Sequence, residues 1–172
     1  HPRNSAPPLL RLTPPPPSCH LSLLAASPPR SPHFPFHRPA GVQLRALGRV
    51  PGYLLSQWAM DEHAGHLRVA YTRTTGATTE NAVDVLDVAS LARVGRLSGL
   101  GMGERIFAVR FAGGVGYMVT FRQIDPLYTL DLTDPTAPRV HGELKIPGYS
   151  DYLHPLDEGT LLGVGRAGSA EG

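Results

Sequence analysis

The 172 residues carry a formal net charge of +2, which combines two unlike parts: residues 1–60 contain six arginines and no acid, whereas 14 acids and 10 basic residues follow from Asp61 onward. The overall basic balance is therefore no indication of a nucleic-acid partner. The single cysteine, Cys19, excludes a disulfide within the chain and a cysteine-based metal site.

Residues 1–40 hold 12 of the 18 prolines and are predicted to be a disordered, polyproline-like segment. One interpretation is a ligand for an SH3-type partner; the lack of acids favours a linker or a stretch that is not native coding sequence. The apolar residues 21–26 are too few to span a membrane and have no basic residue just before them, as a signal peptide would. The chain begins with His1 and its first methionine is Met60, so we expect the native N-terminus to lie elsewhere.

Residues 41–172 are predicted to be globular and all-β, because short alternating apolar stretches are separated by glycine, proline and polar turns. No stretch has the uninterrupted apolar stripe of a helix. After a short apolar stretch at 42–47, a turn is expected over 61–65 and a polar loop or hairpin connection over 72–81. The expected strands lie at residues 53–60, 66–71, 82–87, 93–97, 104–111, 117–121, 125–132, 139–144, 149–154 and 159–165.

The clearest pattern is the hairpin over residues 104–121, in which Gly113-Gly114 makes the turn. Strict alternation places Ile106, Ala108 and Arg110 on one face of its first strand. The opposite face then carries a second set of side chains: Phe107, Val109 and Phe111.

A repeat relates this hairpin to the rest of the chain. Leu86-Asp87 matches Leu130-Asp131 at a spacing of 44 residues, and four short strands lie in each unit. Four strands recurring every ~40–50 residues are the signature of a β-propeller blade. We therefore expect blades at 54–97 and 104–144 and half a blade at 149–165. Since a ring needs ~4–8 blades, the sequence predicts a fragment, with further blades beyond Gly172.

Several blocks resemble a family as well as a fold. The first block is Gln57-Trp-Ala-Met-Asp-Glu-His63, and six more follow it at residues 65–70, 103–111, 119–127, 131–135, 142–148 and 149–155. In this order the blocks resemble the beta-propeller domain family of secreted bacterial and archaeal proteins. That family is distantly related to WD-type repeats. The resemblance covers about residues 48–166, leaves residues 1–40 unmatched, and departs at Ala59, where the family usually has serine. It implies a propeller and a secreted or cell-surface location, and it carries no catalytic residue over.

Two groups of residues are candidates for a metal or a structural role. Asp61, Glu62 and His63 would suit Ca²⁺ or a transition ion, but a carboxylate that caps a tight turn is the favoured interpretation. Asp125 and Asp134 precede prolines as turn starters. Asp131 has an equivalent in Asp87, and a residue repeated in each blade is more often structural than catalytic.

The candidates for a channel or interaction face are Asp61, Glu62, His63 and Asp125, together with Arg110, Asp151 and His154. Arg110 on an inner strand would bind an anionic ligand or, as we favour, pair with Asp151 of the next blade. His154, before Pro155, would be a general base at the channel mouth, although a hydrogen-bonded structural role is the favoured interpretation. We assign no catalytic residue, no metal ligand and no cofactor.

The function expected is therefore that of an exported, non-enzymatic interaction or surface-scaffold module with a protein or surface-polymer partner. The alternative is an exported hydrolase or lyase whose site forms at the channel from several blades, either with or without Ca²⁺. A third hypothesis is a regulatory propeller that is fused to a separate domain.

Overall fold

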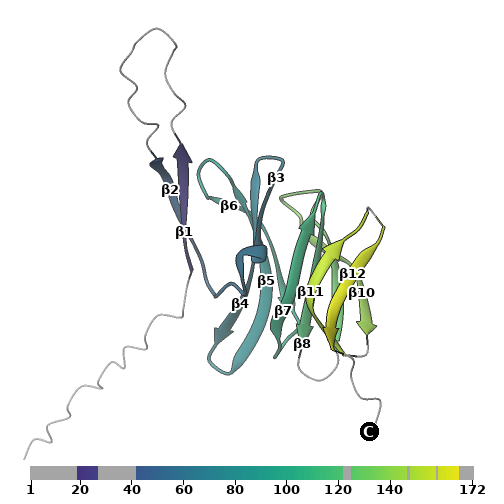
Figure 1. Cartoon of the computed structure of the whole chain (residues 1–172). Helices are drawn as coiled ribbons and strands as arrows, with labels where there is room; N and C mark the ends of the chain where they lie inside the picture. The colour runs from purple at the N-terminus through teal and green to yellow at the C-terminus, as the bar shows by residue number, and fades with distance from the viewer. Residues whose placement is uncertain (1–18, 27–41, 122–124, 147, 158, 167–172) are drawn as a thin grey trace, which may run out of the picture.

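The computed structural model describes residues 19–26, 42–121, 125–146, 148–157 and 159–166. These residues form antiparallel sheets and a single turn of 3-10 helix (Figure 1). Blade 1 contains η1 (Gln57–Ala59), β3 (Met60–His63), β4 (His66–Thr75), β5 (Thr78–Asp87) and β6 (Arg93–Leu100). Blade 2 contains β7 (Arg105–Ala112), β8 (Val115–Phe121), β9 (Asp125–Asp131) and β10 (Arg139–Ile146).

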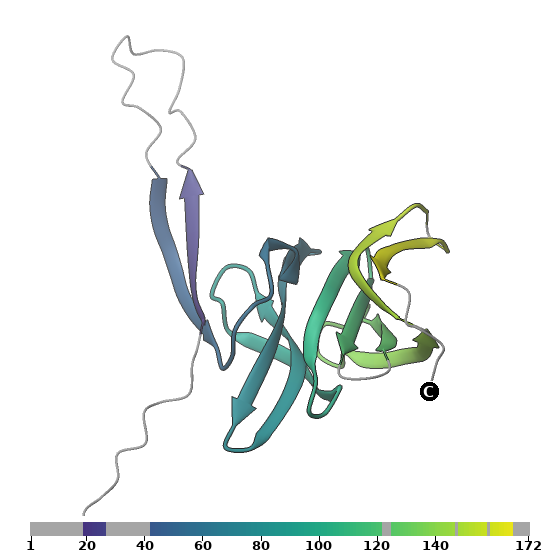
Figure 2. The ribbon, with the colours of Figure 1, turned by 60° about the horizontal axis from the view of Figure 1, so that its bottom comes forward.

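The third sheet pairs β11 (Tyr149–Pro155) with β12 (Leu161–Arg166). Figures 1 and 2 show the sheets side by side in the order of the chain. The prediction of an all-β, partial propeller with two four-stranded blades and half of a third is confirmed.

Buried apolar side chains fill the space between successive sheets. Ala70 and Val83 of blade 1 pack with Val109, Met118 and Leu130 of blade 2. On its other face, blade 2 meets the third sheet through a smaller cluster, which contains Ala108, Val119 and Leu153. Each sheet is thus stabilised mainly by its neighbours in sequence, because burial of apolar area is the main favourable term in folding.

A hairpin of β1 (Cys19–Ala26) and β2 (Val42–Val50) packs through one end against blade 1, on the side away from blade 2, and projects beyond it (Figure 2). Leu21 and Val50 pack there against Val69 and Tyr71. Part of the segment predicted to be disordered therefore forms a strand, which pairs with β2 and buries Leu21. Residues 1–18 and 27–40, the rest of that prediction, lie outside the described residues.

The start of blade 1 differs from the prediction. The expected strand over 53–60 is interrupted by η1. Ser56 caps the N-terminus of this turn, because its hydroxyl accepts a 3.2 Å hydrogen bond from the Trp58 amide. The expected turn over 61–65 is shorter, because Asp61, Glu62 and His63 lie in β3 and the chain reverses at Ala64 and Gly65. The expected loop over 72–81 belongs to the β4–β5 hairpin, since its threonines are good strand formers.

A β-bulge changes the faces of β7. Phe107 is an extra residue between Ile106, which pairs with Thr120, and Ala108, which pairs with Val119. Ile106 therefore packs with Val109 and Phe111 in the cluster between blades 1 and 2. The prediction that Ile106 shares a face with Ala108 was wrong for this reason.

The connection from blade 1 to blade 2 is fixed by buried polar groups. Asn81 is fully buried, and its amide nitrogen donates to the carbonyls of Leu100 at 3.0 Å and Glu104 at 3.3 Å. Its side-chain oxygen accepts a 2.7 Å hydrogen bond from Thr72, whose hydroxyl also accepts from the Ile106 amide. Side chains from the second and third strands of blade 1 thereby set where blade 2 begins.

Replacing Asn81 by leucine should lower the free energy of unfolding by about 2 kcal/mol, because the buried carbonyl of Leu100 and the partly buried carbonyl of Glu104 would lose their donor. Thr72→Val should cost about 1 kcal/mol, since it removes one hydroxyl from the same network. Urea denaturation followed by circular dichroism measures both. Thr74→Val, at an exposed position of the same strand, is the control and should stay within about 0.5 kcal/mol of the parent; an equally small loss for Asn81→Leu would contradict the assignment.

Aspartates at the strand ends have the repeated structural role that the sequence predicted. The Asp131 carboxylate accepts from the amide and hydroxyl of Thr133 and, through its other oxygen, from the Arg139 guanidinium at 2.7 Å. Asp87 accepts in the same way from the amide and hydroxyl of Ser90. These hydrogen bonds lower the pKa of Asp131 from 3.8 to about 2, and those from Thr133 have the largest effect.

The pH dependence of stability should show this effect. Because the folded-state pKa of Asp131 lies below its unfolded value of 3.8, the unfolded chain binds the proton more readily. The stabilisation that Asp131 contributes is present above the unfolded pKa of 3.8, and it is lost as the pH falls towards the folded pKa of about 2. Asp131→Asn should therefore flatten the fall in the urea midpoint between pH 4.5 and pH 2.5. An unaltered pH profile for Asp131→Asn would contradict this account.

Candidate functional site

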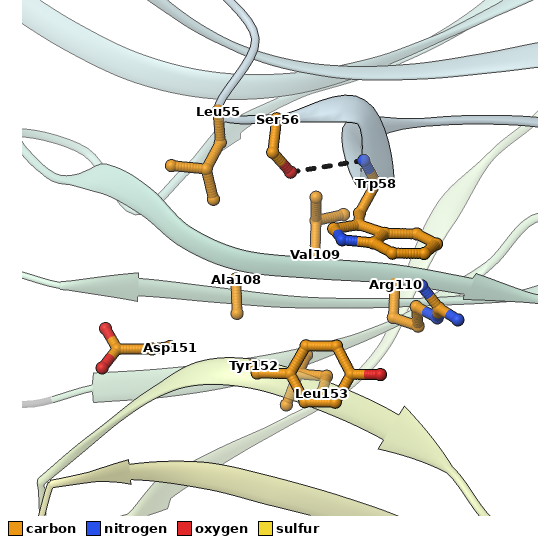
Figure 3. Close-up of a pocket in the computed structure, with 9 residues that line it drawn as sticks. All are labelled: Leu55, Ser56, Trp58, Ala108, Val109, Arg110, Asp151, Tyr152 and Leu153. Atoms are coloured by element: carbon orange, nitrogen blue, oxygen red, sulfur yellow. Dashed lines mark hydrogen bonds between the residues drawn. The ribbon is translucent and has the colours of Figure 1, made fainter.

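The inner ends of three successive sheets lie next to one another, since η1 and β11 both flank β7. We call this the channel-side face, because the first strand of a propeller blade lies nearest the central channel. It carries a shallow hollow that is open to solvent (Figure 3). The hollow is lined by Leu55, Ser56, Trp58, Ala108, Val109, Arg110, Asp151, Tyr152 and Leu153.

An exposed tryptophan and an arginine dominate one end of the hollow. The Ser56 cap holds the turn that presents Trp58, whose side chain is 45% exposed. The guanidinium carbon of Arg110 lies 4.1 Å from the centroid of the Trp58 ring, which is a cation–π contact between blades 1 and 2. Arg110 is directed here because its neighbours Val109 and Phe111 are buried.

The predicted ion pair between Arg110 and Asp151 is not formed. Figure 3 shows the two side chains at opposite ends of the hollow, and Arg110 contacts Trp58 of the preceding blade instead. A second bulge explains the position of Asp151. Ser150 pairs with Gly165 and Tyr152 with Val164, so Asp151 is the extra residue and its side chain is exposed.

His154 lies on the same strand, but it is not among the residues that line the hollow. Its ring stacks on Tyr152 with 6.1 Å between ring centroids, and its Nδ1 atom lies 3.2 Å from the Tyr152 hydroxyl. His154 is thus in contact with the neighbour two residues before it on the same strand. Tyr152 lines the hollow itself.

Asp61 belongs to the junction between blades. Its carboxylate accepts from the guanidinium of Arg68, whose side chain is only 3% exposed. Arg68 also donates to the carbonyl of Gly113 in the β7–β8 turn and lies over the ring of Phe111. Asp61 is therefore the partner of an arginine on the adjacent strand, in place of the turn cap that the sequence favoured.

The remaining candidates are not brought to the hollow. Glu62 and His63 lie on β3 opposite Leu67 and His66, and both are exposed. Asp125 begins β9, the third strand of blade 2, and its side chain lies outside the described residues. Within the ranges that the structure describes, no group of three or more histidine, cysteine, aspartate or glutamate side chains is placed to hold a metal ion.

A second polar cluster lies within blade 1. The Asp84 carboxylate, 2% exposed, accepts two hydrogen bonds from Arg96 at 2.6 and 2.8 Å and a third from the Tyr71 hydroxyl at 3.2 Å. Burial, and then the charge of Asp84, raise the pKa of Tyr71 to about 12. The charges in this cluster are paired, so its role is to hold β4, β5 and β6 together.

Comparison with known proteins places these features in a family. The family described as Beta propeller domain matches residues 33–172. An uncharacterised protein of Archaeoglobus fulgidus is 54% identical over 127 residues, which cover 73% of this chain and 20% of the relative. An uncharacterised protein of Methanocaldococcus jannaschii is 50% identical over 123 residues, which cover 69% of this chain and 20% of the relative.

The chain thus spans about a fifth of the length of the curated relatives it matches. No solved structure matches it significantly. Within the described ranges, no helix has the length and apolar character needed to cross a membrane. The family match begins at residue 33, before the start of the resemblance found in the sequence at about residue 48. Both the four-stranded blades and this match show that the chain belongs to the beta propeller domain family.

Proposed function

We propose that the chain forms part of an exported, non-enzymatic interaction module that binds a protein or a surface polymer through its channel-side face. The observation that carries the proposal is the pairing of exposed Trp58 with Arg110 beside Tyr152. Tryptophan, tyrosine and arginine are the residue types enriched at the energetic centres of binding interfaces. Export to the cell surface is the part of the proposal that rests on the family resemblance alone.

The rigidity of the face supports binding. Trp58 is held by a capped turn, Arg110 by a central position on β7, and Tyr152 by its contact with His154. Side chains that are already ordered lose less conformational entropy when a partner binds. Catalysis at the channel, the alternative function, would need acid–base groups from other blades to converge on this face.

Site-specific cross-linking in the native cells tests the proposal. A photo-reactive amino acid in place of Leu55, which is exposed beside Trp58, should cross-link to one partner species. Trp58→Ala in the same chain should reduce the cross-linked yield about tenfold, because loss of a central aromatic contact typically costs ~2 kcal/mol or more. Mass spectrometry identifies the partner, and fractionation of the cells tests export.

The control is the same photo-reactive group in place of Leu144, which is similarly exposed but lies on β10, the outermost strand of blade 2. This position should not capture the species seen from position 55. Equal capture from both positions, or a yield that Trp58→Ala leaves unchanged, would contradict the proposal. Turnover of a polysaccharide or peptide substrate that is lost in Trp58→Ala would support the catalytic alternative.

A further inference from the structure

Arg110 differs from most arginines of the two blades in having no carboxylate partner. Four others each donate to an acid, namely Arg68, Arg73, Arg96 and Arg139. Within the part of the chain that the structure describes, Arg110 makes neither an ion pair nor a hydrogen bond, and its one polar contact is the ring of Trp58. Its N–H donors are therefore available to a ligand.

Stacking on Trp58 prepares this guanidinium for an anion. Arginine presents a planar fork of donors that matches a carboxylate in a bidentate way. The aromatic ring covers one face of the fork and restricts its rotation, so less freedom is lost when an acceptor binds. Partial burial of Arg110 beside Val109 further strengthens such an interaction relative to one in bulk water.

The rest of the hollow presents apolar side chains next to Arg110 and then a carboxylate. Ala108 and Leu153 form an apolar middle, and the exposed carboxylate of Asp151 lies at the end opposite Arg110 (Figure 3). Within the described ranges Asp151 has no ion-pair partner. The hollow thus offers a cation at one end and an anion at the other.

Building on the proposed function, we infer that this hollow binds a peptide segment carrying a carboxylate and, a short distance along it, an ammonium group. Arg110 takes the carboxylate, the apolar middle covers the intervening carbon atoms, and Asp151 takes the ammonium. An acidic polysaccharide, with a negative charge on successive sugars, would bring like charge against Asp151 and is disfavoured for that reason.

Intrinsic fluorescence tests the inference directly, because Trp58 is the only tryptophan of the chain. The probe is the tripeptide Lys-Ala-Glu with both ends blocked, so that its charges are one ammonium and one carboxylate. Its carboxamide analogue Lys-Ala-Gln should bind the full chain about tenfold more weakly, as expected for the loss of a charge-assisted hydrogen bond. The peptide Gln-Ala-Glu lacks the ammonium group and so tests the contact with Asp151. A short galacturonate oligomer tests whether the hollow binds an acidic polysaccharide instead.

Variants assign the binding to its two ends. Arg110→Gln should weaken Lys-Ala-Glu about tenfold, and Arg110→Lys should restore part of the affinity. Arg139→Gln is the matched control, because this exposed arginine is already paired with Asp131 on the far side of blade 2, and it should leave binding unchanged. Asp151→Asn should weaken Lys-Ala-Glu and leave Gln-Ala-Glu unaffected. Urea midpoints equal to that of the parent show that each variant is folded.

Equal affinity for Lys-Ala-Glu and Lys-Ala-Gln would overturn the inference, as would tighter binding of the galacturonate oligomer than of the tripeptide. The outcome is separable from that of the proposed function. A cross-linked partner that is lost in Trp58→Ala but retained in Arg110→Gln would uphold the binding face and reject the carboxylate chemistry. A partner unaffected by Trp58→Ala would reject the binding face itself.

Discussion

The docking of blade 2 on blade 1 depends on polar groups buried between them, and the channel-side face depends on that docking. Arg68 joins Asp61 to the carbonyl of Gly113, and Asn81 holds the connection that leads into β7. A buried polar group left without a partner costs ~1–3 kcal/mol, so any shifted arrangement of the blades is disfavoured. Trp58 and Arg110 come from different blades, and their stacking therefore follows from this one arrangement.

The fold was largely predictable because its signals are local and repeated. Alternating apolar residues, glycine turns and the recurrence of Leu86-Asp87 as Leu130-Asp131 were enough to place both blades and the third sheet. The bulges at Phe107 and Asp151 were not predictable, because one extra residue in a strand leaves the composition of that strand unchanged. The bulge at Phe107 changed the face that strict alternation had assigned to Ile106.

The candidate site was predictable only in part. Arg110 and Asp151 were expected at the channel and do line the hollow, whereas Trp58 was assigned to a buried strand. Ser56 two residues before Trp58 is a capping signal that could have indicated the exposed turn. The partner of Asp61 could not be read from the sequence, because Arg68 lies opposite it only in the particular register of β3 and β4.

The packing of each sheet on its sequence neighbours has a consequence for how the molecule opens. In such a linear array, stability is approximately a sum of terms within units and between adjacent units. Central strands β5 and β8 are buried along much of their length, whereas β12 has mostly exposed residues. Backbone amides should therefore exchange with solvent deuterium in a graded order, fastest in β12 and slowest in β5 and β8.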